Sequence, residues 1–292
     1  MKILVANVGS TTFKYKLFNM HDQTVLAEGR IERIGKQEAP VEHRTGQHRV
    51  QMHQMVPDYP AAVRDVLDRL THPETGVLKD LAELNAVGFK TVHIRGEAGT
   101  FELTEDILER MADYNDLAPA HNPPYIQAIR IFRDLYPDLP LVGLFEAAFH
   151  TTLPDYAYIY SVPYSWYETY GVRKYGFHGA SHRYVSERVP KILNRPVQKL
   201  VSCHLGGSAS LCAIKNGQSI DTTMGFSPQD GIINSTRNGH IDPFIIPFIM
   251  DRENLSIKEI QRILSKERGL LGISGISEDM RDLEAAIQEG ND

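Results

Sequence analysis

Two glycine-containing turns follow apolar runs of the sequence and are the first candidates for chemistry. The segment 9–12 (GSTT) comes after the run 3–8, and the segment 206–208 (GGS) comes after the run 199–205. Glycine lets backbone N–H groups approach an anion closely, so such a turn can cradle a phosphate. Neither turn matches the Walker pattern or the GxGxxG fingerprint, and each alone could be an ordinary hairpin turn. Their equivalent places in two similar segments favour phosphate binding.

Two histidines lie four residues apart in YGFHGASHRYV (175–185). This spacing could place a pair of metal ligands on one face of a helix. His178 precedes Gly179, however, so the two rings are not expected to share a helical face. The alternative is that one of the two histidines caps the following helix and the other packs against the sheet. The spacing alone does not decide between the two.

Further polar side chains lie in places where α/β enzymes gather their chemistry. His121 lies in a proline-bracketed loop (LAPAHNPP), and Arg237 lies in a polar, glycine-bearing stretch (STRNGHIDP). Glu146 and His150 follow a buried run, at the kind of strand end where α/β sites form. Each alone could be structural. Composition and spacing therefore predict no more than an anion-binding α/β enzyme.

Apolar patterning predicts the elements that must position these residues. Alternating strands and helices indicate an α/β fold. A strand, a glycine turn and a hairpin occur at 3–20 and again at 199–224, which indicates an internal duplication. The Tyr- and Pro-rich segment 151–170 suggests a boundary between domains 1–150 and 151–292, and 36–55 suggests a loop with an edge strand. Strands are expected at 3–8, 13–20, 24–34, 84–94, 140–146, 199–205, 209–215 and 218–224, and helices at 61–70, 105–115, 125–135, 181–194, 256–268 and 278–288.

The composition excludes several classes of protein. Of 292 residues, 42% are hydrophobic and 23% charged, which is typical of a globular chain. The net charge of −6 gives no electrostatic case for a nucleic-acid partner, and no apolar run approaches the length of a membrane span. The N-terminus lacks the features of a signal peptide. Cys203 and Cys212 favour a reduced, cytoplasmic protein over a disulfide framework.

Five long motifs resemble those of the acetate kinase family, in the family's order and spacing, and the match is collinear from residue 1 to 290. The resemblance implies the actin/sugar-kinase/Hsp70 (ribonuclease H-like) fold, with an acyl-substrate-side first domain and a nucleotide-side second domain that is incomplete. It also implies a cytoplasmic homodimer that converts ATP and acetate into ADP and acetyl phosphate with Mg²⁺. The motifs are NVGSTTFKYKLF (7–18), YGFHGASHRYV (175–185), HLGGSASLCAIKNGQSIDTTMGF (204–226), STRNGHIDP (235–243) and GISGISEDMRDLE (272–284).

The resemblance implies roles for individual residues, and they suit phosphoryl transfer, which needs positioning and cations more than covalent chemistry. Asn7 is expected at the metal and Lys14 near the nucleotide phosphates. The transferring phosphoryl group is expected near His121, Glu146, His178 and Arg237. The phosphate loop would be His204, Leu205, Gly206, Gly207 and Ser208, the adenosine side Asp279, Met280 and Arg281, and the wall of the acyl pocket Val92, Ala120, Phe177 and Pro228.

The sequence also departs from the family pattern. Lys90 stands where the family has a carboxylate-binding arginine, Phe89 replaces a histidine, and one extra residue could let Arg95 reach in instead. Lysine cannot make the planar bidentate grip of arginine on a carboxylate. Glu146 stands where the family has its catalytic aspartate, and it places its carboxylate one methylene further out. Ala120 stands where the family has a leucine, and the smaller side chain is expected to leave room for an acid larger than acetate.

Family members continue well past this C-terminus, so three hypotheses stay open. The first is a working kinase for acetate or another short-chain acid. The second is a truncated, weak or inactive kinase-fold protein that acts by binding or assembly, with an exposed strand edge. The third is an N-terminal fragment of a longer acetate kinase.

Overall fold

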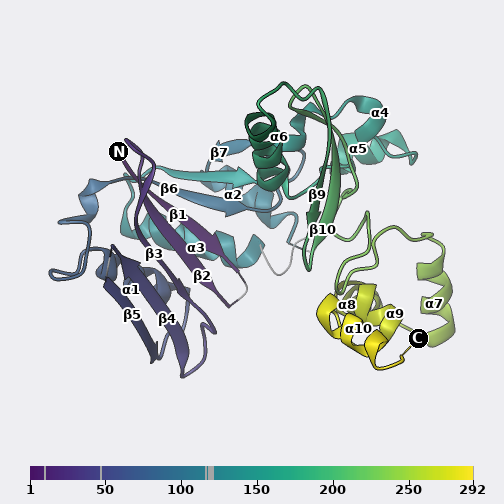
Figure 1. Ribbon diagram of the computed structural model, residues 1–292. Helices are drawn as coiled ribbons and strands as arrows, with labels where there is room; N and C mark the ends of the chain where they lie inside the picture. Colours follow the sequence, from purple (N-terminus) through teal and green to yellow (C-terminus); the bar gives the residue numbers. More distant parts are fainter. Residues whose placement is uncertain (10, 47, 116, 118–121, 292) are drawn as a thin grey trace. The chain divides into compact units, whose positions relative to one another are not determined.

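The computed structural model describes residues 1–9, 11–46, 48–115, 117 and 122–291, with the backbone alone at 265 and 266. The chain divides into two compact units, Met1–Glu146 and Ala147–Asp292, which are drawn from purple to teal and from teal to yellow (Figure 1). The expected boundary after residue 150 lies four residues further along the chain. His150 belongs with the second unit because its ring bonds Ser219 and the Phe177 carbonyl.

Unit 1 is built on a mixed eight-stranded sheet in the order β5-β4-β3-β2-β1-β6-β8-β7. The pairs β1–β6 and β6–β8 are parallel, and the other neighbouring strands are antiparallel. The parallel pairs place the carboxyl ends of β1, β6 and β8 at one edge of the sheet. The strands are β1 (Lys2–Val8), β2 (Phe13–Asn19), β3 (Thr24–Ile31), β4 (Ala39–Thr45), β5 (His48–Gln54), β6 (Leu84–Thr91), β7 (Thr100–Glu102) and β8 (Leu141–Phe145).

The segment 36–55 differs from its prediction, because it forms the two paired strands β4 and β5 rather than a loop with one edge strand. Alternate residues of β4 are buried, and two of these inward positions hold His43 and Thr45. Polar residues at inward positions break the apolar alternation by which strands are recognised in a sequence. The short strand β7 was also not expected.

Three helices of unit 1 cover one face of the sheet. The helices are α1 (Tyr59–Leu70), α2 (Glu105–Ala112) and α3 (Asn122–Leu135), with a 3₁₀ turn at Leu81–Glu83. Asp58 caps α1 by accepting from the Ala61 amide at 2.8 Å. The apolar stripe of α3 packs towards β1 and α1, and it buries Ile126, Ile129 and Phe132. The helices at 61–70, 105–115 and 125–135 are thus confirmed, within a few residues at their ends.

Unit 2 contains a three-stranded antiparallel sheet, β11-β10-β9, against which α6 (Gly179–Leu193) packs. Its strands are β9 (Lys199–Leu205), β10 (Ala209–Lys215) and β11 (Gln218–Thr222). Asn216 and Gly217 join β10 to β11 with positive φ angles of 51° and 78°, as a two-residue hairpin turn requires. Among the described residues β9 is paired with β10 alone, and Val201 and Leu205 are 63% and 74% exposed.

The remaining helices of unit 2 are short, and only α8 and α10 among them were expected. Helix α7 (Ile245–Glu253) escaped prediction because apolar residues occur all round it, so its sequence has no helical period. Ser256 and Glu259 form a capping box that starts α8 (Ile257–Lys266). No helix in the described part of the chain is long and apolar enough to cross a membrane. The others are η2 (Ala148–Thr152), α4 (Asp155–Tyr158), α5 (Tyr164–Tyr170), α9 (Gly269–Ser274) and α10 (Met280–Gln288).

Candidate active site

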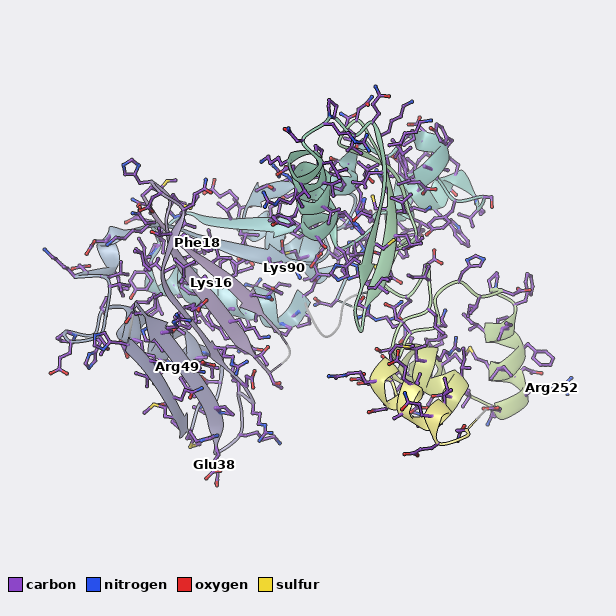
Figure 2. The ribbon with its side chains drawn as sticks, viewed as in Figure 1. Lys16, Phe18, Glu38, Arg49, Lys90 and Arg252 are labelled. Atoms are coloured by element: carbon purple, nitrogen blue, oxygen red, sulfur yellow. The ribbon has the colours of Figure 1, made fainter. Side chains whose placement is uncertain are left out.

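Lys90 and Glu146 form an ion pair at the carboxyl ends of two neighbouring parallel strands of unit 1. Lys90 lies near the end of β6, where Figure 2 labels it, and Glu146 directly follows β8. Lys90 Nζ lies 2.5 Å from Glu146 Oε1, and the Glu146 amide donates to the Thr91 carbonyl at 3.1 Å. The side chain of Lys90 is 48% exposed and that of Glu146 only 8%. A half-exposed ammonium group thus compensates a buried carboxylate.

Neither Arg95 nor Phe89 contributes a second positive charge beside Glu146. Arg95 does not take the place of the absent arginine, because its Nη1 lies 2.9 Å from Asp113 Oδ2. Phe89 is 1% exposed and packs edge-on against Phe132, with ring centroids 5.7 Å apart, so it belongs to the core. The positively charged side chain that pairs with Glu146 is therefore Lys90.

Asn7 lies near the carboxyl end of β1, and its amide is held by Tyr125 from α3. The Tyr125 hydroxyl donates to Asn7 Oδ1 at 3.1 Å and accepts from the Val8 amide at 3.0 Å. Tyr125 is 1% exposed, and burial raises the pKa of its phenol, so the hydroxyl keeps the proton that it donates. An amide oxygen accepts two hydrogen bonds or ligands. Asn7 Oδ1 therefore retains one position for a further ligand.

Lys14 stands opposite Asn7 in the β1–β2 register and lines a groove of about 1060 Å³ on this face of the sheet. Four other basic residues in the groove share Glu28 and Glu42 as ion-pair partners, and Figure 2 shows Lys16 and Arg49 among them. Lys14 makes no ion pair with any residue that the structure describes. It is the uncompensated cation of the groove, which also contains Val5, Asn7, Tyr15, Lys16, Glu28, Gly29, Arg30, Glu42, Arg44, Gly46 and Arg49.

Three histidines of unit 2 meet where α6 packs against the sheet. The ring of His178 stacks on that of His204, with centroids 4.0 Å apart and planes at 22°. His178 Nδ1 lies 2.8 Å from Ser210 Oγ, and His182 lies with Nε2 2.8 Å from the same oxygen. His178 occupies the N-cap position of α6 with φ 59° but makes no capping bond through its side chain. The spacing therefore reflects packing of His182 against the sheet rather than a metal pair.

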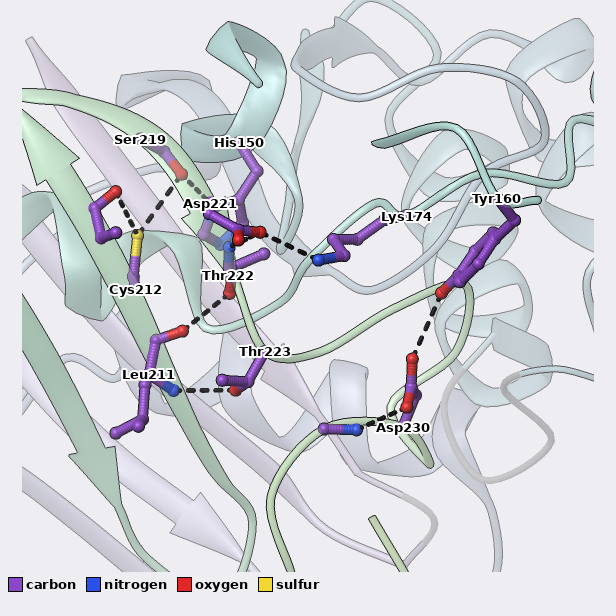
Figure 3. Close-up of polar contacts among 12 residues, drawn as sticks. His150, Tyr160, Lys174, Leu211, Cys212, Ser219, Asp221, Thr222, Thr223 and Asp230 are labelled. Atoms are coloured by element: carbon purple, nitrogen blue, oxygen red, sulfur yellow. Dashed lines mark hydrogen bonds and ion pairs between the residues drawn. The ribbon is translucent and has the colours of Figure 1, made fainter. Parts of the chain in front are cut away.

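Phe177 is held at its backbone by His150. His150 Nε2 bonds the Phe177 carbonyl at 3.0 Å, and Nδ1 lies 2.8 Å from Ser219 Oγ, which Figure 3 shows together with Cys212. Gly176 has φ 74°, and a Cβ there would lie 2.6 Å from His150 Cδ2. The Phe177 side chain is 2% exposed. Glycine before Phe177 thus lets the chain cross closely over the His150 ring.

Arg237 reaches the loop that follows β9. Its Nη1 donates to Ser208 Oγ at 3.0 Å and to the Pro228 carbonyl at 3.4 Å, and burial lowers the pKa of its guanidinium. The Asn234 side chain, 2% exposed, fixes the segment before Arg237, because its Oδ1 accepts from the Ala209 amide at 2.6 Å. The structure thus brings Ser208, Pro228 and Arg237 into contact, with Arg237 as a positioned cation.

The other members of the predicted phosphate loop and adenosine side are more open. In the loop, Leu205 is 74% exposed, and Gly206 and Gly207 are also exposed. Asp279 caps α10 by accepting from the Arg281 amide at 2.9 Å, and its carboxylate also pairs with the Arg281 guanidinium. This pairing, chiefly the hydrogen bond from the Arg281 side chain, lowers the pKa of Asp279 to about 2. Met280 is exposed beside them.

The two units carry different members of the predicted acyl pocket. Val92 in unit 1 is 8% exposed, while Phe177 and Pro228 belong to unit 2. Ala120 and His121, to which the sequence analysis gave a pocket and a phosphoryl role, lie outside the described residues. The roles of all these side chains stay predictions.

The described residues offer few ligands for Mg²⁺. No group of three or more His, Cys, Asp or Glu side chains in the described ranges could hold a metal ion. Mg²⁺ prefers oxygen ligands and commonly takes most of them from substrate phosphates and water, with one or two from the protein. The remaining acceptor position of Asn7 Oδ1 fits such a site, so the residues present are compatible with a metal that arrives with a nucleotide.

Sequence reasoning missed several residues that shape the site. Tyr125 appeared only as one more member of the apolar stripe of α3. Ser210 lies inside one of the resembling motifs and Asn234 directly precedes another, but short polar residues next to glycine turns are common in any loop. Their hydrogen bonds join positions 25 to 118 residues apart, and no local pattern reports such a contact.

The chain is similar to known proteins over its whole length. The model of the acetokinase family matches residues 2–292. The acetate kinase of Thermoanaerobacterium thermosaccharolyticum is 46% identical over 296 residues, covering 100% of this chain and 74% of that protein. The acetate kinase of Natranaerobius thermophilus is 47% identical with the same coverage.

Solved structures agree with the sequence matches. A propionate kinase from Francisella tularensis superimposes with a TM-score of 0.88 at 36% identity, covering 99% of this chain and 74% of that one. The acetate kinase of Porphyromonas gingivalis gives a TM-score of 0.84, also at 36% identity and with the same coverage. The predicted fold and the predicted class of phosphotransferase are confirmed. The chain belongs to the acetokinase family.

Proposed function

We propose that this chain transfers the terminal phosphoryl group of ATP to the carboxylate of acetate or another short-chain acid. The observation that carries the proposal is Arg237, a half-buried guanidinium held on Ser208 in the loop between β9 and β10. Phosphoryl transfer depends on fixed cations around the transferring oxygens. His178 and His204 lie near the end of β9 and are the neighbouring donors that we assign to this task.

The reaction needs no general base. A carboxylate oxygen forms the new bond to the terminal phosphorus while the bond to the bridging oxygen of ADP breaks, and no proton moves. The chain must therefore orient the acid, place cations on the phosphoryl oxygens and limit water. In unit 2 this requirement suits His178 and Arg237, which offer N–H donors, and in unit 1 it suits Lys14, which offers an ammonium group.

Lys90 is the residue that we assign to the acid carboxylate. Its ammonium group is compensated by Glu146 at 2.5 Å, so an incoming carboxylate shares Lys90 with that side chain. Sharing one point charge gives a weaker grip than a bidentate arginine. We therefore expect a high KM for the acid. We also propose that Ala120 leaves room for propionate or butyrate.

The metal, the assembly and the compartment complete the proposal. Mg²⁺ bound with the nucleotide would neutralise phosphate charge, and Asn7 is the residue that would hold it. We propose a homodimer from the family resemblance, which light scattering after size-exclusion chromatography tests. A reduced cytoplasmic setting suits Cys203 and Cys212, which are both free thiols.

The test is an assay that traps acyl phosphate as the hydroxamate, with ATP and acetate, propionate or butyrate. Lys90→Ala should raise the KM for the acid at least about tenfold, which corresponds to about 1.4 kcal/mol. Lys174→Ala is the matched control, because Lys174 also pairs with a carboxylate, Asp221, at 2.9 Å. Lys90→Arg together with Glu146→Asp should lower the KM below that of the parent chain.

Two results would count against the proposal. If the parent chain forms no acyl phosphate with any of the acids while calorimetry detects ADP binding, this chain is a binding protein without transfer activity. If Lys90→Ala and Lys174→Ala change the KM equally, Lys90 does not hold the acid.

A further inference from the structure

Four residues of unit 2 form one continuous chain of hydrogen bonds that ends at His178. Ser202 Oγ lies 2.9 Å from His182 Nδ1, His182 Nε2 lies 2.8 Å from Ser210 Oγ, and Ser210 Oγ lies 2.8 Å from His178 Nδ1. Ser202, His182 and Ser210 are at most 2% exposed. Water therefore has almost no access to the three inner members.

His182 carries a single ring proton in this chain. Burial, and to a smaller extent its neighbours His150 and His204, lowers the pKa of His182 to about 4. The ring is neutral at pH 7, so one nitrogen donates and the other accepts. Each serine hydroxyl also has one proton to donate. The direction of every bond in the chain is thus coupled to the next.

Three proton orders satisfy the three bonds, and two of them leave a buried hydroxyl proton without an acceptor among these bonds. If His182 donates from Nδ1 to Ser202, the Ser202 proton has no such acceptor. If Ser202 donates to His182 Nδ1 and Ser210 accepts from both His182 Nε2 and His178 Nδ1, the Ser210 proton has none. Every inner donor has an acceptor only when Ser202 donates to His182, His182 donates to Ser210 and Ser210 donates to His178 Nδ1. An unpaired buried donor costs about 1–3 kcal/mol, so this last order is favoured.

We propose that Ser202, His182 and Ser210 are positioning residues that fix the neutral tautomer of His178, with its proton on Nε2. His178 then offers an N–H donor rather than a lone pair from that nitrogen. Phosphoryl oxygens accept hydrogen bonds, and a carboxylate acceptor needs no base, so this tautomer suits phosphoryl transfer. The inference rests on the proposed function for its purpose, but the tautomer itself does not depend on activity.

The surroundings of His178 restrain its ring in this orientation. The parallel stack with His204 opposes rotation of the ring, and His204 is itself tied through Nδ1 to Ser181 Oγ at 2.9 Å. In the β9–β10 register Ser210 stands opposite His204, so the hydrogen bond to Ser210 and the stack on His204 come from one place in the sheet. A hydroxyl at residue 210 is therefore placed to select the tautomer.

The experiment measures histidine tautomers by long-range ¹H–¹⁵N NMR of the full chain labelled with ¹⁵N-histidine, at pH 7.5 and without nucleotide. We expect His178 and His182 to carry the proton on Nε2 and to accept at Nδ1. Ser210→Ala should change the His178 nitrogen shifts towards a mixture of tautomers and lower kcat about tenfold, with little change in KM. Ser210→Thr, which restores a hydroxyl, should restore both.

Ser219→Ala is the matched control, because Ser219 is fully buried and lies 2.8 Å from the Nδ1 of a different histidine, His150. It should change His150 and leave the His178 spectrum unaltered. A proton on His178 Nδ1 in the parent chain, or a His178 spectrum that Ser210→Ala leaves unchanged, would overturn the inference. A chain with the expected tautomers and no acyl phosphate would refute the proposed function alone.

Discussion

Two buried histidines, His43 in unit 1 and His182 in unit 2, have lost nearly all contact with water but differ in their hydrogen bonds. They are 2% and 0% exposed, and burial lowers the pKa of each to about 4. His182 bonds a serine at each ring nitrogen. His43 Nδ1 bonds the Tyr15 hydroxyl, but Nε2 has no partner among the described residues.

The difference separates what burial decides from what hydrogen bonding decides. Burial alone makes both rings neutral, because it penalises the charged form wherever the ring lies. Of the two rings only His182 has both nitrogens paired, so only at His182 does the direction of one hydrogen bond fix the direction of the next. His43 stacks on Tyr15, with centroids 6.0 Å apart, and serves as packing within the core of the sheet.

Removing each ring gives the largest expected effect. His182→Ala should lower the free energy of unfolding by about 4 kcal/mol, because it leaves a cavity, removes the acceptor of the buried Ser202 hydroxyl and removes one of the two hydrogen bonds of Ser210. His43→Ala strands one hydroxyl, that of Tyr15, and should cost about 2 kcal/mol. Urea unfolding measures both, with fluorescence of Trp166, the single tryptophan, reporting on unit 2 and circular dichroism on the whole chain. Equal losses would show that the second bond of His182 adds nothing.

Acidification should give the next largest effect. The folded pKa of about 4 lies below the ordinary value of 6.5, so the unfolded chain binds more protons between these values and stability falls as the pH falls. Each of the two histidines should lower the free energy of unfolding by about 2 kcal/mol between pH 7 and pH 5. His182→Gln should remove this loss from the Trp166 transition, and His43→Gln should leave that transition sensitive to pH. If the urea midpoint of the Trp166 fluorescence transition in the parent chain does not change with pH, the prediction is wrong.

The smallest effect is expected when both members of the unit 1 pair become apolar. Tyr15→Phe together with His43→Leu removes the unpaired Nε2 along with the hydroxyl, so the double variant should lie within about 1 kcal/mol of the parent. Each single variant should cost more than the double variant, which a double-mutant cycle measures. The matching change in unit 2, Ser210→Ala with His182→Leu, should cost more because Ser202 still loses its acceptor.

Local patterns were sufficient for much of the fold. The alternation in β2, the stripe of α3 and the Asn216-Gly217 turn each lie within a few residues, and each structure follows from that segment alone. Strand β4 was missed because His43 takes an inward position that is usually apolar. Helix α7 was missed because its apolar residues surround the whole helix. For β4 the position of the segment in the sheet, rather than its own pattern, decides which side chains are buried.

For the site as well, the sequence identified candidate residues but not their contacts. The motifs identified Asn7, Lys14, His178 and Arg237 as candidates through their resemblance to one family, without any knowledge of their contacts. They gave no sign that Tyr125 would hold Asn7, because 118 residues separate the two. They also left open whether Lys90 or Arg95 binds the acid, and they gave no sign that the pairing of β6 with β8 would place Lys90 against Glu146 while Arg95 pairs with Asp113.

The sequence by itself determined the family, the hairpin that Asn216 and Gly217 close, and which residue types are available for phosphate chemistry, because these depend on neighbouring residues or on long motifs. Only the tertiary structure decided which polar atoms are removed from water and which partners they meet. In the sequence, Ser202, Ser210 and His43 cannot be distinguished from exposed polar residues. Their roles arise because strand pairing and helix packing bury them against particular groups, and a buried polar atom must find a partner or cost free energy.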